Sequence, residues 1–254
     1  MKNKEIKEVV KKRYGGLAKQ EQQKQSCCPS CCGSASSMLK SQGIGYGKED
    51  LERIPEESVL GLGCGNPIAI AELKAGEVVL DLGSGAGVDV FLAANKVGPA
   101  GRVIGVDMTG EMVDKAKRIA TDHGYTNVEF RLGEIEKLPV EDNSVNAIIS
   151  NCVINLSPDK AKVFREAYRV LKPEGRLTVS DIVSEGVIPD EIKNDPDAWT
   201  GCIAGALQRQ EYLDKIKKAG FADIQTLSTR EFYVENKANE TQEKLFSITV
   251  KACK

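Results

Sequence analysis

The chain has 254 residues, of which 41% are hydrophobic and 28% charged, and its formal net charge is −2. This is the composition of an ordinary globular protein, and its near-neutral balance argues against a surface built for nucleic acid or an anionic membrane. No apolar run approaches the length of a membrane span. The chain start lacks the apolar segment of a signal peptide, so we expect a cytoplasmic protein whose thiols rest reduced. A single histidine, His123, argues against a histidine-based triad or metal site.

The N-terminal residues 1–24 predict a short amphipathic helix, because Ile6, Val10 and Tyr14 fall at helical spacing. We expect this helix to pack one face on the body of the protein; a partner-binding arm is the alternative. The next residues, 25–47, are rich in Ser, Gly and Cys, which predicts an irregular segment.

From about residue 77, apolar runs alternate with helical segments. The runs predict buried strands at 77–82, 102–107, 128–132, 145–150 and 175–182. The helices between them are expected to end near 96, to span 111–122, and to begin with Ser157 as N-cap. This alternation predicts right-handed βαβ units and a mostly parallel sheet. The tail predicts a helix near 210–219 and an antiparallel edge hairpin with strands near 223–233 and 244–252.

A glycine-rich turn, Asp-Leu-Gly-Ser-Gly-Ala-Gly at residues 81–87, follows the first strand. Glycine lets a ligand approach the backbone closely, and the start of the next helix offers free N–H groups. Asp107, at the end of the second strand, can accept hydrogen bonds from both hydroxyls of a ribose. The structural alternative is that these glycines only permit tight packing of helix on strand. The third glycine comes too early for a dinucleotide fingerprint.

The glycine pattern resembles that of S-adenosylmethionine-dependent methyltransferases, and residues 133–139 resemble the adenine-contacting loop of that superfamily. The resemblance implies a Rossmann-like class I α/β fold, with strand order 3-2-1-4-5 and the cofactor over the carboxyl ends of strands one to three. It implies a sheet of about seven strands with an N-terminal helical extension and a small C-terminal lobe. The implied cofactor-binding residues are Asp81, Gly83, Ser84, Gly85, Gly87, Asp107, Met108, Gly133, Glu134, Ile135 and Asn151.

Three cysteines, Cys64, Cys152 and Cys202, stand alone in short stretches rich in Gly and Asn. We expect such loops not to bury a cysteine as a small apolar residue. For Cys152, the alternative is that it packs in the hydrophobic core at a strand end. With the implied strand order, Cys152 follows strand four and Cys202 follows strand five. Their sulfurs would lie at the same carboxyl-terminal edge of the sheet, beside the cofactor, and the Cys64 turn could fold over this edge. Three sulfurs around one point suit a soft, trigonal acceptor.

A cluster of four cysteines, Cys27, Cys28, Cys31 and Cys32, lies near the N-terminus. A zinc knuckle would need a second pair of ligands nearby, and none appears. We interpret the cluster as a mobile thiol reservoir that can swing into the site; a decoration without function is the alternative. Cys253, in the last predicted strand, is interpreted as structural.

The segments 61–67, 150–156 and 201–206 resemble the signature segments of arsenite S-adenosylmethionine methyltransferases, and Arg13-Tyr14-Gly15 resembles that family's opening helix. The resemblance implies methyl transfer to arsenic(III) held by the three isolated cysteines, with disulfide formation returning arsenic to the trivalent state. It implies arsenite, its thiol conjugates or methylarsenite as substrate. One or more of the four clustered cysteines would join the redox cycle, with thioredoxin or glutathione as the reductant.

The expected organisation has three parts: an N-terminal helix and Cys-rich segment (1–60), a cofactor-binding core (61–184), and a C-terminal part that completes the arsenic site and the sheet edge (185–254). Two other functions stay open: a methyltransferase for an organic carbon acceptor such as a quinone, and a non-catalytic thiol protein that binds soft metals. The chain has only one Trp, six Tyr and six Phe, which argues against a large organic pocket. The glycine-rich turn with Asp107 argues against a non-catalytic binder.

Overall fold

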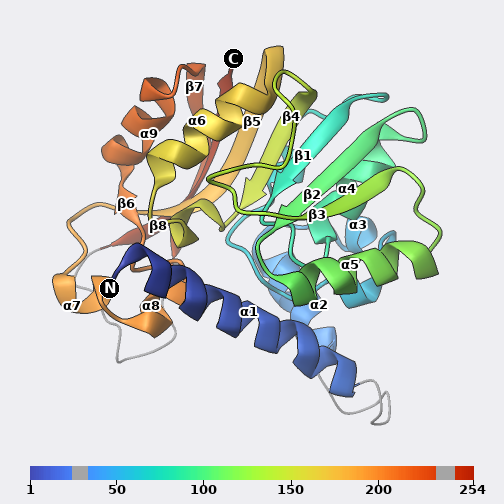
Figure 1. Cartoon of the computed structure of the whole chain (residues 1–254), viewed down its shortest axis with the longest axis horizontal. Coiled ribbons are helices and arrows are strands. Elements are labelled where there is room, and N and C mark those ends of the chain that lie inside the picture. The colour runs from blue at the N-terminus through green and yellow to red at the C-terminus, as the bar shows by residue number, and fades with distance from the viewer. Residues whose placement is uncertain (25–33, 233–243) are drawn as a thin grey trace.

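The computed structural model describes residues 1–24, 34–232 and 244–254, so the cysteine cluster at 27–32 lies outside the described residues. One sheet forms the centre, with strand order β3-β2-β1-β4-β5-β8-β7 and with β6 paired to β5 (Figure 1). The strands are β1 (Val78–Leu82), β2 (Arg102–Asp107), β3 (Val128–Leu132), β4 (Val145–Asn151), β5 (Leu171–Ser184), β6 (Leu207–Gln208), β7 (Ala222–Phe232) and β8 (Leu245–Cys253).

The strand pairs from β3 to β5 are all parallel, while β8 runs antiparallel to both β5 and β7. The predicted order 3-2-1-4-5, the mostly parallel sheet and its antiparallel edge are confirmed. The second strand of the C-terminal pair, β8, lies next to β5, and β7 forms the edge. The C-terminal strands therefore extend the central sheet.

The helices are α1 (Asn3–Lys24), α2 (Ser34–Gly43), α3 (Lys48–Glu52), α4 (Val88–Val97), α5 (Gly110–Asp122), α6 (Lys160–Val170), α7 (Asp190–Lys193), α8 (Pro196–Thr200) and α9 (Arg209–Lys218), with 3-10 turns η1 (Glu56–Ser58), η2 (Pro67–Ala69) and η3 (Ile154–Leu156). None of the helices within the described ranges combines the length and apolar character that crossing a membrane requires.

Both faces of the sheet are covered, which explains why its central strands are continuous apolar runs. Leu80 and Leu82 of β1 point to the face covered by α6 and α9, where they pack in one core with Phe164 and Tyr212. Val79, the residue before Leu80, points to the opposite face and packs with α4 and α5. Successive side chains alternate across a strand, so each face receives its own core from one run of residues.

Two local predictions were wrong. The segment 25–47 was expected to be irregular, but residues 34–43 form α2. Met38 of this helix, and Ile44 just after it, pack against the apolar cluster that includes Phe91 of α4. Helix α6 begins at Lys160, and its N-cap is Asp159, whose carboxylate accepts a hydrogen bond from Lys162 N at 3.0 Å. The predicted cap, Ser157, instead ends the turn η3.

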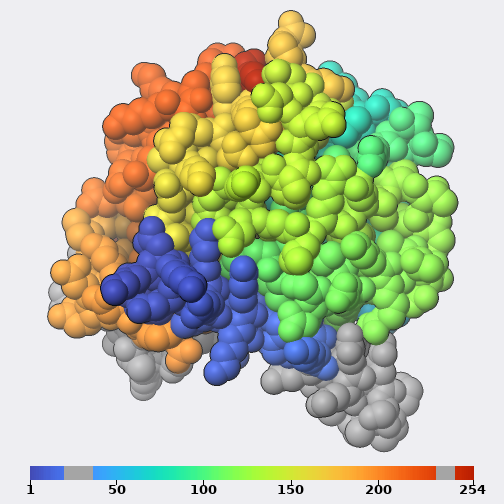
Figure 2. Space-filling model, in the orientation of Figure 1, coloured from blue at the N-terminus to red at the C-terminus, as the bar shows by residue number. Residues whose placement is uncertain are grey.

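Helix α1 fills nearly all of the predicted range 1–24, and it lies across the molecular surface between α5 and α8, as Figure 2 shows. Ile6 and Val10 are buried, at 4% and 1% exposure. The Lys7 ammonium pairs with the carboxylates of Glu134 and Glu136 at 2.8 and 3.0 Å. The helix therefore packs on the body of the protein, as expected of its amphipathic pattern.

Candidate active site

A cavity of about 300 Å³ opens at the carboxyl ends of the parallel strands. Its lining comes from the turn after β1, the ends of β2 and β4, the strand β5, and helix α1. The predicted site residues that line it are Asp81, Gly83, Ser84, Gly85, Asp107, Met108, Ile135, Asn151, Cys152 and Cys202. The glycine-rich turn and two of the predicted thiols thus share one cavity, whereas Cys64 is not among the residues that line it.

The glycine-rich turn is held against the end of β2. Gly85 N donates a hydrogen bond to Asp107 Oδ2 at 3.0 Å, and Thr109 N donates to Asp107 Oδ1 at 2.8 Å. Each carboxylate oxygen can accept a further hydrogen bond, so Asp107 can still accept from ligand hydroxyls. Gly83 has φ +70°, and a Cβ there would lie 2.3 Å from Val153 Cγ2, so this position needs glycine for packing as well.

Three predicted cofactor residues do not line the cavity. Gly87 is the N-cap of α4, where an added Cβ would meet Phe91 at 2.8 Å, and Gly133 packs against Pro139. The Glu134 carboxylate pairs with Lys7 at the surface. In the same loop Glu136 lines the cavity instead. A cofactor role for these three residues stays a prediction.

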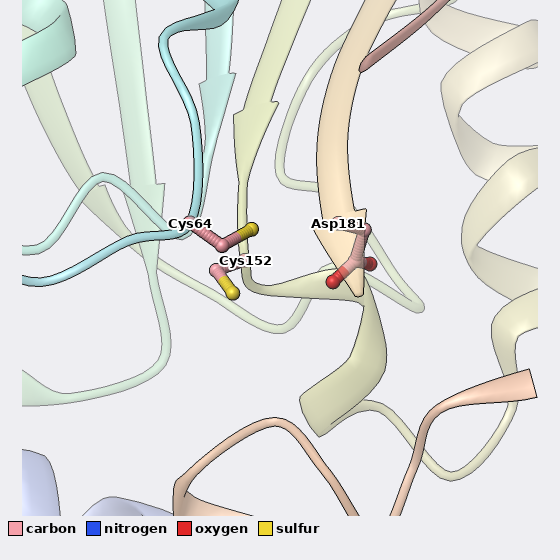
Figure 3. A group of neighbouring side chains, drawn as sticks. All are labelled: Cys64, Cys152 and Asp181. Carbon is pink, nitrogen blue, oxygen red and sulfur yellow. The ribbon is translucent and has the colours of Figure 1, made fainter. Parts of the chain in front are cut away.

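The three isolated cysteines come together from distant parts of the chain. The sulfurs of Cys64 and Cys152 and a carboxylate oxygen of Asp181 all lie within 4.8 Å of one another (Figure 3). The Cys202 thiol lies beside them and donates to the Cys152 carbonyl oxygen at 2.9 Å. Cys253, by contrast, lies within β8.

The expectation that these loops would not bury their cysteines was wrong. Cys64 is 3% exposed and Cys202 is 4% exposed. Both belong to an apolar cluster that includes Val10 of α1, Leu156 of η3 and Trp199 of α8. Elements remote in sequence supply the cover, which the composition of the loops alone does not reveal.

Two of the cysteines have a left-handed backbone conformation, with φ +59° at Cys152 and φ +61° at Cys202. This conformation costs a residue other than glycine about 1–2 kcal/mol. It is held by hydrogen bonds: Cys152 N donates to Ser180 O at 2.8 Å, and Asn155 Nδ2 donates to Cys202 O at 3.3 Å. Strain that its surroundings hold in place is typical of functional sites.

Asn151, predicted as a cofactor residue, ties the Cys64 loop to the end of β4. Its Oδ1 accepts from Cys64 N at 3.1 Å and Gly65 N at 3.3 Å, and its Nδ2 donates to Gly65 O at 2.8 Å. Nδ2 also donates to the Tyr46 hydroxyl at 2.8 Å, which in turn donates to Asp89 Oδ1 at 2.8 Å. These bonds hold Cys64 next to Cys152, the neighbour of Asn151 in sequence.

Comparison with known proteins identifies the family. A family model described as a methyltransferase domain matches residues 73–220. The solved structure of an arsenic(III) S-adenosylmethionine methyltransferase from Chlamydomonas reinhardtii is 36% identical to the chain, with a TM-score of 0.70, over 87% of this chain and 73% of that one. This chain belongs to the arsenite methyltransferase family.

Two curated relatives named arsenite methyltransferase show how far the similarity extends. The relative from Halobacterium salinarum is 47% identical over 231 residues, which cover 87% of this chain and 58% of the relative. The human relative is 35% identical over 246 residues, which cover 93% of this chain and 63% of the relative. The chain thus spans about three fifths of the length of these members of the family.

In this member of the arsenite methyltransferase family, the surroundings of Cys64 and Cys152 favour the protonated thiols. Burial raises the pKa of the Cys64 thiol. The neighbouring thiols of Cys202 and Cys64, followed by burial, raise the pKa of Cys152 well above its usual value. A soft element binds the thiolate, so these thiols must lose their protons when they bind it.

A second buried polar group, centred on Asp181, supports the thiol site. Asp181 Oδ2 accepts from Tyr212 Oη and from Asn155 N, both at 3.1 Å. Lys160 Nζ donates to Ser157 O at 3.0 Å and to Asn155 O at 3.3 Å. Burial raises the pKa of Asp181 to about 7 and lowers that of Lys160 to about 8. The pKa values of this buried carboxylate and this buried ammonium therefore both lie near neutral pH.

Several residues around the cavity were missed in the sequence: Lys7, Tyr14, Tyr46 and Asp89. The Tyr14 hydroxyl donates to Thr200 O at 3.2 Å, which links α1 to the Cys202 segment. The amphipathic spacing of α1 predicted a buried face but not the surface on which it packs. Asp181 did carry a signal, because it is an acidic residue inside an otherwise buried strand.

Proposed function

We propose that this protein transfers methyl groups from S-adenosylmethionine to trivalent arsenic held by Cys64, Cys152 and Cys202. The observation that carries the proposal is that the three thiols converge beside one cavity, which Cys152 and Cys202 line together with the glycine-rich turn and Asp107. Arsenic(III) is soft and three-coordinate, so sulfur ligands suit it better than carboxylate or imidazole. The curated relatives named arsenite methyltransferase support the choice of substrate.

The residues act mainly by positioning. S-adenosylmethionine supplies a methyl group already activated on a sulfonium. The backbone N–H groups of the turn and the carboxylate of Asp107 hold the donor, while three thiolates hold arsenic and direct its lone pair. Such positioning can supply roughly 7–11 kcal/mol of a barrier. The reaction needs no strong general base, which agrees with a chain that has one histidine.

Redox balance accounts for cysteines beyond three ligands. Methyl transfer uses the arsenic lone pair and leaves arsenic formally pentavalent. Two thiolates return two electrons when they close a disulfide, and arsenic becomes trivalent again. We assign Cys152 and Cys202 as the retained ligands and Cys64 as the third ligand and disulfide partner. Thioredoxin or glutathione then reduces the disulfide, which agrees with a cytoplasmic location.

The direct test is replacement of the ligands. Cys152→Ser and Cys202→Ser should each abolish methylation because arsenic loses a thiolate, while binding of S-adenosylmethionine measured by calorimetry should persist. Products from arsenite, S-adenosylmethionine and a thiol are identified by mass spectrometry. Cys253→Ser, which removes a thiol from β8, is the matched control and should keep full turnover. Undiminished turnover in either ligand variant would refute the assignment.

The four clustered cysteines have a separate test. Replacing Cys27, Cys28, Cys31 and Cys32 together by Ser should spare a single turnover and impair repeated turnover, because the cluster is proposed to reset the site. Rapid-quench measurement of the first methylation is compared with the steady-state rate. Equal loss of both rates would contradict a reservoir role.

A further inference from the structure

One carboxylate faces the sulfurs at the base of the site. Asp181 on β5 is 0% exposed, and one of its carboxylate oxygens lies within 4.8 Å of both the Cys64 and the Cys152 sulfur. Figure 3 shows a carboxylate oxygen of Asp181 directed toward the two cysteines, which come from a loop and from the end of β4. Arsenic held by three thiolates has no need of this oxygen.

The donor set of two sulfurs and one oxygen suits another class of ion. Zn²⁺ and Cd²⁺ accept thiolate and carboxylate ligands together in four-coordinate sites. Two sulfurs bound to one Zn²⁺ lie about 3.8 Å apart at tetrahedral angles. The three ligand atoms, all within 4.8 Å of one another, therefore need to close by only about 1 Å to coordinate such an ion.

The surroundings leave Asp181 able to coordinate. Tyr212 and Asn155 both donate to Oδ2, whereas Ile182 N donates to Oδ1 at 3.1 Å. Within the described residues, Oδ1 accepts no second hydrogen bond. One of its two acceptor positions is therefore open. A divalent cation together with the nearby Lys160 ammonium balances the charge of two thiolates and one carboxylate.

We propose that Cys64, Cys152 and Asp181 form a binding site for a thiophilic divalent cation, Zn²⁺ or Cd²⁺, with water as the fourth ligand. Binding displaces the two thiol protons to solvent and changes no oxidation state. The Cys202 thiol stays directed at the Cys152 carbonyl oxygen and is not required. The ion occupies two of the sulfurs proposed for arsenic, so it excludes arsenite; only this competition rests on the proposed function.

The test uses the full chain with Cys27, Cys28, Cys31 and Cys32 replaced by Ser, because those thiols would bind the same cation. Cd²⁺ titration, followed by thiolate-to-cadmium absorbance, should reach one ion per chain. Cadmium NMR should report a site with two sulfur ligands and oxygen. A signal typical of three or four sulfurs, or no saturable binding, would overturn the proposal.

Two variants should separate the cation from arsenite. Asp181→Asn should weaken Cd²⁺ binding at least about tenfold, because the carboxylate ligand is lost. Cys202→Ser should leave Cd²⁺ binding unchanged and weaken arsenite binding, read from the fluorescence of Trp199, the only tryptophan, which packs in the Cys202 cluster. The opposite pattern, or equal effects of both variants on both ligands, would contradict the site.

Asp181 also accepts hydrogen bonds from Tyr212 and Asn155, so circular dichroism checks that the Asp181→Asn chain is folded. If that variant is unfolded, the cadmium NMR signal of the chain that keeps Asp181 decides. Failure of the proposed function has a different signature. A chain that binds Cd²⁺ as described but yields no methylated arsenic would refute methyl transfer and leave the cation site standing.

Discussion

At the scale of single residues, the site depends on cysteines in a conformation that the backbone disfavours. Cys152 and Cys202 both have a left-handed φ, and the hydrogen bonds from Cys152 N to Ser180 O and from Asn155 to Cys202 O hold it. Burial then sets their chemistry, since a thiolate removed from water is costly unless a ligand or cation meets it. A buried thiol should therefore stay inert until a soft element arrives.

This predicts an unusual pH dependence of thiol reactivity. The pKa values of Cys64 and Cys152 are raised, so the reactive thiolate is scarcer at every pH below those values than in a free thiol. Alkylation of both by iodoacetamide should be slow at pH 7 and should rise at a higher pH than for N-acetylcysteine. Peptide mass spectrometry follows each site. Alkylation of either residue at pH 7 as fast as the free thiol would contradict the raised pKa.

At the scale of elements, the Cys64 loop has no regular structure of its own and is held by β4, α4 and the segment after α2. Asn151 at the end of β4 bonds to the loop backbone, and Tyr46 joins Asn151 to Asp89 in the first turn of α4. Asp89 is the second residue of α4, two positions after the last glycine of the glycine-rich turn. One chain of hydrogen bonds thus connects the cofactor side of the cavity to the thiol side.

Breaking this chain should loosen Cys64 selectively. Tyr46→Phe removes the hydroxyl between Asn151 and Asp89, and loss of a buried partner costs about 1–3 kcal/mol of unfolding free energy. Asn151→Asp keeps the acceptor for Cys64 N but loses the donor to Gly65 O. In both variants alkylation of Cys64 should speed up relative to Cys202, as measured by mass spectrometry.

A matched control is Tyr168→Phe on α6. It also removes one tyrosine hydroxyl, but on the face of the sheet that α6 and α9 cover. It should leave the ratio of Cys64 to Cys202 alkylation unaltered. If Tyr46→Phe and Tyr168→Phe shifted that ratio equally, the hydrogen-bonded chain would have no role in placing Cys64.

At the scale of the whole molecule, helix α1 closes the cavity that the sheet builds. Lys7, Val10 and Tyr14 line the cavity, and α1 packs on both α5 and α8. Lys7 pairs with Glu136, whose side chain is 7% exposed, and with Glu134. The first residues of the chain therefore cover a site built from residues far along the sequence.

Weakening this contact should let the cofactor leave faster. Lys7→Met keeps the aliphatic stem but removes the charge that pairs with Glu136. Within the described residues, Glu136 then keeps the hydrogen bond from the Ser157 hydroxyl. If about 1 kcal/mol of closure is lost, dissociation of S-adenosylmethionine should accelerate about fivefold in stopped-flow measurements. Lys4→Met, an exposed lysine on the same helix, should leave the rate as it is. Equal rates in Lys7→Met and the unsubstituted chain would show that α1 does not close the site.

The sheet, the glycine-rich turn with Asp107 and the family were predictable from the sequence, because apolar runs, glycine spacing and cysteine contexts are local patterns. It did not determine α2, the start of α6 at Asp159, or the burial of Cys64 and Cys202. The folded arrangement was needed to show that Asp181 faces the sulfurs and that Asn151 holds the Cys64 loop. These features depend on contacts between residues far apart in the chain, and packing, which no short pattern records, brings those residues together.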